Sequence, residues 1–118
     1  MLPNSAAPLS SLHTASRVLA SDARWLVHFW ERGQGWLWRK PNPNLALGIP
    51  LNEGERLHSL GMGFPLEIAY CNAAGKVLHI ITLPPLRIAP AVAGAVVAWE
   101  LVAGGLEGVE VGETLLCD

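Results

Sequence analysis

The fold of this chain is decided by residues 66–83, LEIAYCNAAGKVLHIITL. Both ends of this stretch are rich in branched and aromatic residues, and side chains alternate over residues 66–71 as in a half-buried strand. Between the ends, Asn-Ala-Ala-Gly is typical of a hairpin loop with glycine in its last position. The stretch therefore predicts an antiparallel hairpin of residues 66–71 and 76–83. A loop that closes symmetrically would place Glu67 opposite Ile80, and His79 opposite Ile68.

Further strands are predicted on both sides of the hairpin. The segment AVVAWELV, residues 95–102, predicts a strand that carries Trp99 and Glu100 on opposite faces. Shorter strands are expected at residues 45–51 and 114–117. The chain contains 12 glycines and 9 prolines, so it turns often and does not suit a helix bundle.

One helix is expected in the N-terminal part of the chain. Residues 23–32 follow Asp22, which can cap the start of a helix, and precede Gly33, which can end one. Three apolar side chains in this segment lie at helical spacing: Leu26, Phe29 and Trp30. The predicted fold class is therefore α+β and mostly β, a small antiparallel, partly barrel-like sheet with one N-terminal helix.

Length and composition restrict the class of protein. A chain of 118 residues suits one domain with its own core. With 51% hydrophobic and 15% charged residues, disorder along the whole chain is excluded. The net charge of -2 and the pI of about 6.0 argue against non-specific nucleic-acid binding, which needs clustered Lys and Arg. We expect residues 1–14 to be a mobile tail and residues 15–118 to be a single domain.

The N-terminal sequence and the cysteines bear on the compartment. No basic residue precedes Arg17 and no continuous apolar run follows, so we expect no secretory signal and a cytoplasmic protein. Residues 88–106 resemble a membrane span, but Glu100 and several Gly and Pro residues favour a buried strand. Cys71 is expected to be a small buried thiol, and a bridge to Cys117 in an oxidising compartment is the alternative.

None of the common catalytic or cofactor motifs is complete in this sequence. The Gly-Gln-Gly at residues 33–35 lacks the third glycine of a dinucleotide loop. Leu57 stands where a nucleophile motif around Ser59 would need its first glycine. The four histidines do not have the spacing of metal ligands: His13, His28, His58 and His79. We therefore expect no metal and no cofactor.

One segment stands out from the rest, residues 57–68, LHSLGMGFPLEI. It resembles the signature of the DUF192 family, a run similar to His-Thr-x-Gly-Met-x-Phe-Pro-Ile-Asp. Other segments resemble further motifs of that family, in the same order along the chain: RGQGWLWR at 32–39, GIPL at 48–51, NAAG at 72–75, WELVAG at 99–104 and GE at 112–113. The resemblance extends from about residue 24 to residue 117.

The chain departs from the family pattern at several polar positions. Ser59 replaces the usual Thr, Asn72 replaces the Asp of the hairpin, and Glu67 and Glu113 replace Asp. Members of the family are small bacterial and archaeal domains without an established activity. The resemblance therefore implies a small uncharacterised domain and does not imply a reaction.

Four polar residues lie in the best-matching segments: Arg39, His58, Glu67 and Glu100. As a functional site, they would share a pocket in which Arg39 and His58 contact an anionic or hydroxylated ligand, and a carboxylate acts as base or acceptor. As a structural network, the arginine would pair with a carboxylate and the histidine would bond to backbone carbonyls. We favour the network. Trp36 and Trp38 form a second candidate, a surface patch.

Two hypotheses about function follow. The first is a small, non-catalytic, β-rich binding or accessory domain of the DUF192 type, whose ligand or protein partner is unknown. The alternative is a small enzyme, a hydrolase or isomerase, that uses a His–carboxylate pair. A homodimer through the tryptophan-rich surface is a third hypothesis. We expect no nucleic-acid partner and no membrane span.

Overall fold

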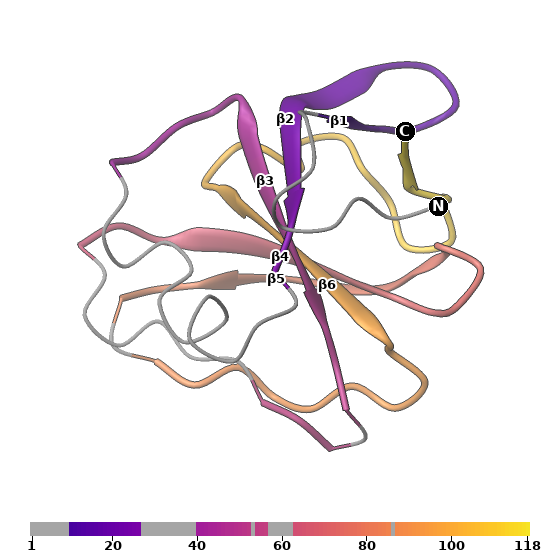
Figure 1. The fold of residues 1–118 in the computed structure, drawn as a ribbon. Helices are drawn as coiled ribbons and strands as arrows, with labels where there is room; N and C mark the ends of the chain where they lie inside the picture. Colours follow the sequence, from indigo (N-terminus) through magenta and orange to yellow (C-terminus); the bar gives the residue numbers. More distant parts are fainter. Residues whose placement is uncertain (1–9, 27–39, 53, 57–62, 86) are drawn as a thin grey trace.

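One curved sheet contains all the strands of the described part of the chain (Figure 1). The computed structural model describes residues 10–26, 40–52, 54–56, 63–85 and 87–118. Within these residues there is no helix. The strands are, in chain order, β1 (Ser10–His13), β2 (Val18–Trp25), β3 (Leu45–Pro50), β4 (Leu66–Cys71), β5 (Val77–Leu83), β6 (Val97–Val102) and β7 (Leu116–Cys117).

The sheet curls until its two ends meet. Its strand order is β5-β4-β6-β3-β2-β1-β7, and neighbours are antiparallel except β2 and β3. The segment before β7 bonds to the start of β5. Val77 N donates to Glu113 O over 2.8 Å, and Leu115 N donates to Gly75 O over 2.9 Å. In Figure 1, β4 and β5 cross the direction of β2 and β3 steeply, as in a strongly coiled sheet. The predicted partly barrel-like sheet is thus confirmed as a half-barrel, but the prediction of a purely antiparallel sheet is wrong, because β2 and β3 pair in parallel.

Gly75 ends the β4–β5 loop and takes part in this closure. Its φ of +83° lies in the left-handed region that favours glycine. A Cβ atom there would also lie 2.8 Å from the carbonyl oxygen of Leu115. Both the turn and the contact between the sheet edges therefore require a residue without a side chain.

Hydrophobic side chains are buried on both faces of the sheet, which we name after a residue in each. The Tyr70 face buries Leu26, Leu45, Leu47, Ile49, Leu66, Ile68, Tyr70, Leu83, Ala89 and Ala98. The Trp99 face buries Leu12, Ala20, Ala23, Trp25, Ala46, Ala69, Cys71, Val77, Trp99, Leu101, Leu106 and Leu115. Burial on both faces explains why β3 and β4 are almost continuous apolar runs. The predicted alternation in β6 is confirmed, although that strand begins at Val97 rather than at residue 95.

Gly48 lets two tryptophans pack across the middle of the sheet. In the strand pairing, it lies opposite Trp25 of β2 on one side and opposite Trp99 of β6 on the other. The two indole rings are 5.8 Å apart between centroids and tilted by 50°. A Cβ atom at Gly48 would lie 2.5 Å from Trp25 and 2.6 Å from Trp99. The two indole rings thus pack directly against the backbone of β3 at Gly48.

The predicted β4–β5 hairpin is confirmed, but its register differs by two residues. Glu67 lies opposite Thr82 rather than Ile80, and His79 lies opposite Tyr70 rather than Ile68. Since the shift is an even number, the alternation still holds, and Glu67 shares its face with Ala69 and Cys71 as predicted.

Two local features produce this shift. Asn72 N donates to Lys76 O over 3.0 Å, and the Asn72 side chain accepts from Lys76 N, so the loop closes one residue later than a symmetric one. A β-bulge beyond this pair then leaves Leu78 without an opposite residue, which moves the pairing by one more position.

The predicted N-terminal helix is not supported. Its first residues, 23–25, complete β2, and residues 27–32 lie outside the described residues. Parallel pairing with β3 fixes this part as a strand, since Asp22 N donates to Asn44 O and Leu26 N donates to Gly48 O. Tertiary hydrogen bonds and the burial of Trp25 outweigh a helical spacing carried by three side chains.

The predicted tail of residues 1–14 is wrong for its last part. Residues 10–13 form β1, which pairs with β2 on one side and with β7 on the other. Leu12 is completely buried on the Trp99 face. The pairing partner in β7 is more than 100 positions away in the sequence, so local composition carried no sign of it. Residues 1–9 lie outside the described residues.

Replacing Gly48 with alanine should destabilise the protein by about 1–3 kcal/mol, because the added methyl overpacks the space between two buried rings. Urea unfolding followed by tryptophan fluorescence measures the change. Gly63→Ala is the matched control, since a Cβ atom at Gly63 would meet nothing within 4 Å. Equal stabilities of the two variants would contradict the packing argument.

Candidate functional site

The carboxylate of Glu67 accepts hydrogen bonds from the backbone of a turn. Its Oε2 accepts a hydrogen bond from Gly104 N at 2.7 Å, and its Oε1 accepts one from Leu106 N at 2.8 Å. Both donors belong to the turn that follows β6. The carboxylate thus satisfies two backbone N–H groups that the turn itself leaves unpaired. Both carboxylate oxygens are therefore used by the backbone, whereas the predicted pairing with an arginine stays a prediction, because Arg39 lies outside the described residues.

Glu100 lies on the Tyr70 face and has apolar neighbours. It is opposite Leu47 of β3 and opposite Ile68 of β4, and only 5% of its surface is exposed. The described residues provide its carboxyl group with neither a hydrogen bond nor an ion pair. Burial raises the pKa of Glu100 to about 8, because the charged form cannot be solvated there. The side chain is therefore mainly a neutral acid at pH 7.

The structure separates the two carboxylates that the sequence placed in one candidate pocket. Glu67 pairs with Leu101 and Glu100 pairs with Ile68, so the two glutamates occupy alternating positions and point to opposite faces. They do not share a pocket. The remaining candidates lie outside the described residues: Arg39, His58, Trp36 and Trp38.

An apolar groove flanks the Tyr70 face. It has a volume of about 620 Å³ and is lined by Gly54 and by residues 91–96. Val92 and Ala95 of this lining also pack against the core of that face. Among the residues that the structure describes, the lining consists of Gly, Ala and Val, so none of these residues brings a charged side chain to the groove.

Tyr70 is hydrogen-bonded to the segment that forms the wall of this groove. Its hydroxyl group donates to Pro90 O over 3.1 Å, at the start of the segment that forms the wall. Burial, together with the negative charge of ionised Glu100, raises the pKa of Tyr70 to about 12. The hydroxyl therefore stays protonated, and its donor is used on Pro90.

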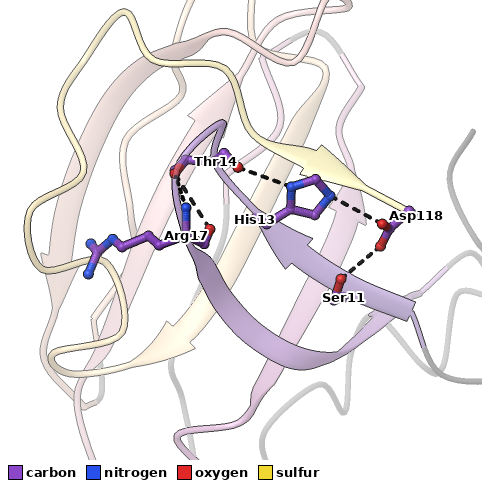
Figure 2. Close-up of polar contacts among 5 residues, drawn as sticks. All are labelled: Ser11, His13, Thr14, Arg17 and Asp118. Carbon is purple, nitrogen blue, oxygen red and sulfur yellow. Dashed lines mark hydrogen bonds and ion pairs between the residues drawn. The ribbon is translucent and has the colours of Figure 1, made fainter.

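A second polar cluster joins β1 and β7, and Figure 2 shows its members. Ser11 Oγ donates to Asp118 Oδ1 over 2.7 Å, and His13 Nε2 lies 3.4 Å from Asp118 Oδ2. The hydrogen bond from Ser11, and next the charge of His13, hold the pKa of Asp118 below its usual value. The sequence alone does not reveal this cluster, because Ser11 and His13 fall in the stretch expected to be a mobile tail. Ser11 and His13 are two positions apart, which places them on the same face only if residues 10–13 form a strand.

The three side chains of this cluster are not arranged as in a nucleophilic site. Activation of a serine needs the imidazole next to the hydroxyl, whereas here the carboxylate of Asp118 lies between Ser11 and His13. His13 Nδ1 donates to Thr14 O over 3.1 Å, so the ring is also engaged by the backbone. The contacts hold the short strand β7 against β1.

The cysteines and the other metal-binding residue types can be placed within the described ranges. The described ranges contain no group of three His, Cys, Asp or Glu side chains able to hold a metal ion. Cys71 and Cys117 are both free, and Cys71 is buried as predicted. Burial raises the pKa of the Cys71 thiol to about 12, which makes it unreactive. The part of the chain that the structure describes has no helix long and apolar enough to cross a membrane.

Two solved structures share this fold. A protein of unknown function from Novosphingobium aromaticivorans DSM 12444 matches with a TM-score of 0.73 and 14% sequence identity, over 97% of this chain and 90% of that chain. A candidate transcription regulator from Sinorhizobium meliloti 1021 matches with a TM-score of 0.70 and 23% identity, over 92% of this chain and 91% of that chain. No family model and no curated protein matches the chain. At these identities the likeness establishes the fold alone.

Glu67→Gln should lower the free energy of unfolding by about 1–3 kcal/mol, because an amide can accept from only one of the two backbone donors and leaves the other unpaired. Urea unfolding at pH 7 measures the loss. Glu110→Gln is the control, since it makes the same change at an exposed position nearby. A Glu67 variant as stable as the control would show that the turn does not need this carboxylate.

Glu100→Gln should change how stability depends on pH. The pKa of Glu100 rises from an ordinary value of 4.5 to about 8 in the folded chain, so the folded state holds the proton more tightly than the unfolded state. The contribution of Glu100 to the free energy of unfolding is therefore largest below about pH 4.5. It decreases as the pH rises to about 8, and it does not change further above that pH. The variant should lack this decline and be more stable than the natural chain at pH 9, by about 1–3 kcal/mol.

Urea unfolding at pH 5, 7 and 9 tests this expectation, with Glu110→Gln again as the control. Parallel pH profiles for the natural chain and the Glu100 variant would contradict it. An NMR titration that gives Glu100 an ordinary pKa would do the same, since it would mean that a cation holds the carboxylate.

Proposed function

We propose that this chain is a non-catalytic binding domain that holds a small, largely apolar molecule in the groove beside the Tyr70 face. The groove itself carries the proposal. Its volume of about 620 Å³ lies within the range of small-molecule sites, about 300–1,000 Å³. The described part of the lining is Gly, Ala and Val, which favours an uncharged body over a nucleotide or an acidic peptide, since both of these need polar partners.

We further propose that the domain belongs to the DUF192 family. The support is the set of segments, in the family's order, that begins with LHSLGMGFPLEI at residues 57–68. Arg39 and His58 remain candidate contacts of the ligand in this proposal, and Trp36 and Trp38 remain a candidate patch. A cytoplasmic location and a homodimer stay predictions from the sequence.

The use of Glu67 favours binding over catalysis. A hydrolase or isomerase built on a His–carboxylate pair needs a carboxylate that is free to accept a proton. Glu67 has both oxygens on backbone donors, and Glu100 lies on the opposite face. Of these two glutamates, only Glu100 is therefore left to serve the alternative of a small enzyme.

Binding of phenylnaphthylamine, an uncharged apolar fluorophore, tests the groove. The natural chain should bind it saturably, with a rise in fluorescence. Ala93→Trp should weaken binding at least ten-fold by filling the groove, whereas Ala73→Trp should leave it unchanged. Both alanines are exposed and lie in turns, but only Ala93 lines the groove. The proposal fails if no saturable binding occurs, or if the two variants bind equally.

A further inference from the structure

The start of the outer edge of β5 is occupied by the segment before β7. Val77 N donates to Glu113 O, and Gly112 N donates to Val77 O, each over 2.8 Å. β5 lies at one end of the strand order, and over residues 79–83 the only described strand that pairs with it is β4, on its inner side. Within the described residues, this second half of β5 is therefore an open sheet edge.

The open part of β5 reaches solvent and lacks the usual protection of a sheet edge. His79 and Thr82 are exposed, and Ile80 and Ile81 are half-buried. Proteins protect sheet edges with charged side chains, proline, bulges or a covering segment. β5 contains no Lys, Arg, Asp, Glu or Pro, and its bulge at Leu78 lies before the open part. Because its branched residues also suit a strand, the edge is able to pair with a further strand.

The pairing around β4 shows which of its backbone groups bond to β5. Val96 N donates to Cys71 O over 2.9 Å, so Cys71 directs its backbone groups to the β6 side of β4. In an antiparallel sheet these directions alternate from one residue to the next. Tyr70 and Ile68 therefore direct their N–H and C=O groups to β5.

The backbone groups of Ile80 and Thr82 point to the open edge. His79 and Ile81 lie opposite the two residues of β4 that bond to β5, so they are hydrogen-bonded to β4. Ile80 and Thr82 alternate with them and direct their N–H and C=O groups the other way. Each of these two residues thus offers a donor and an acceptor to a further strand.

This open edge is complementary to a second copy of itself. When residues 79–83 of two copies run antiparallel about a two-fold axis at Ile81, Ile80 of each copy lies opposite Thr82 of the other. These pairs exchange hydrogen bonds through the groups that point to the edge. Ile81 lies opposite its own counterpart at a non-hydrogen-bonded position, where side chains are closest, so two half-buried isoleucines cover each other. No like charges meet, because residues 79–83 contain no Lys, Arg, Asp or Glu.

We propose that two copies of this chain associate through the open edges of β5, so that their two half-barrels share one continuous sheet. The occupant of the edge is a second copy rather than a foreign peptide, because in this register the same residues satisfy each other's backbone groups. A two-fold pairing of this kind is closed and ends at the dimer. A contact of a few residues a side is smaller than a standard interface of about 1,600 Å², so we expect a weak dimer. The inference is independent of the groove and its ligand.

Sedimentation velocity of the full chain, from about 10 μM to about 1 mM, tests for the dimer. The mass should rise from 12.6 kDa towards twice that value. Thr82→Lys should weaken association about ten-fold or more, because the two added charges lie close together across the two-fold axis. Ser21→Lys is the matched control, since Ser21 is an exposed hydroxyl residue of β2, which has a strand on either side. An equimolar mixture of the Thr82→Lys and Thr82→Glu variants should associate again, because opposite charges then meet.

Disulfide trapping tests the register of the pairing. Ile81→Cys should cross-link two copies on oxidation, because this residue faces its own counterpart at a non-hydrogen-bonded position. His79→Cys should not, because His79 lies opposite Leu83 of the second copy. Both changes are made in a Cys117→Ser background, since Cys117 is half-buried whereas Cys71 is buried. Near-UV circular dichroism checks that all variants are folded.

The inference is overturned if the mass stays at 12.6 kDa up to the highest concentration. It is overturned as well if the Thr82→Lys and Ser21→Lys variants both associate like the natural chain, because the copies then meet at another surface. Cross-linking of the His79→Cys variant as readily as of the Ile81→Cys variant rejects the register, and masses beyond the dimer reject the closed pairing. None of these results affects phenylnaphthylamine binding in the groove, which tests the proposed function separately.

Discussion

The backbone hydrogen bonds between residues 75–77 and 112–115 hold the two ends of the sheet together, and the hydrophobic core of the Trp99 face depends on this closure. Leu12 of β1 and Val77 of β5 come from opposite ends of the strand order, yet both are completely buried in the core of the Trp99 face. A flat sheet would leave them far apart and would expose the whole edge of β5. Closure also brings the last residues of the chain next to β1, where Ser11 and His13 contact Asp118.

The same sheet puts two similar carboxylates to different uses. Glu67 and Glu100 lie on the paired strands β4 and β6, one position apart in the register, and the alternation of side chains sends them to opposite faces. Glu67 accepts two hydrogen bonds from the backbone of a turn and so stabilises the fold. Glu100 meets aliphatic side chains and is neutralised by its surroundings.

Function in this protein has to be argued from the site, because a fold can host many unrelated activities. The two solved structures with the same half-barrel are a protein of unknown function and a candidate transcription regulator, at 14% and 23% identity. Regulation is a property named for the second of these proteins. For this chain, the groove whose described lining is Gly, Ala and Val is the feature on which the proposed binding function rests.

The sequence by itself determined the local features of this protein. It predicted the β4–β5 hairpin, the alternation of Trp99 and Glu100 in β6, the burial of Cys71 and the need to explain the two glutamates, because period-two patterning and turn residues act over a few positions. Only the tertiary structure decided the rest. The bulge at Leu78 set the hairpin register, pairing with β7 made residues 10–13 a strand, and pairing with β3 made residues 23–25 a strand in place of a helix. The separation of Glu67 from Glu100 was decided in the same way, since the face that a side chain occupies relative to another strand depends on hydrogen bonds between segments far apart in the chain.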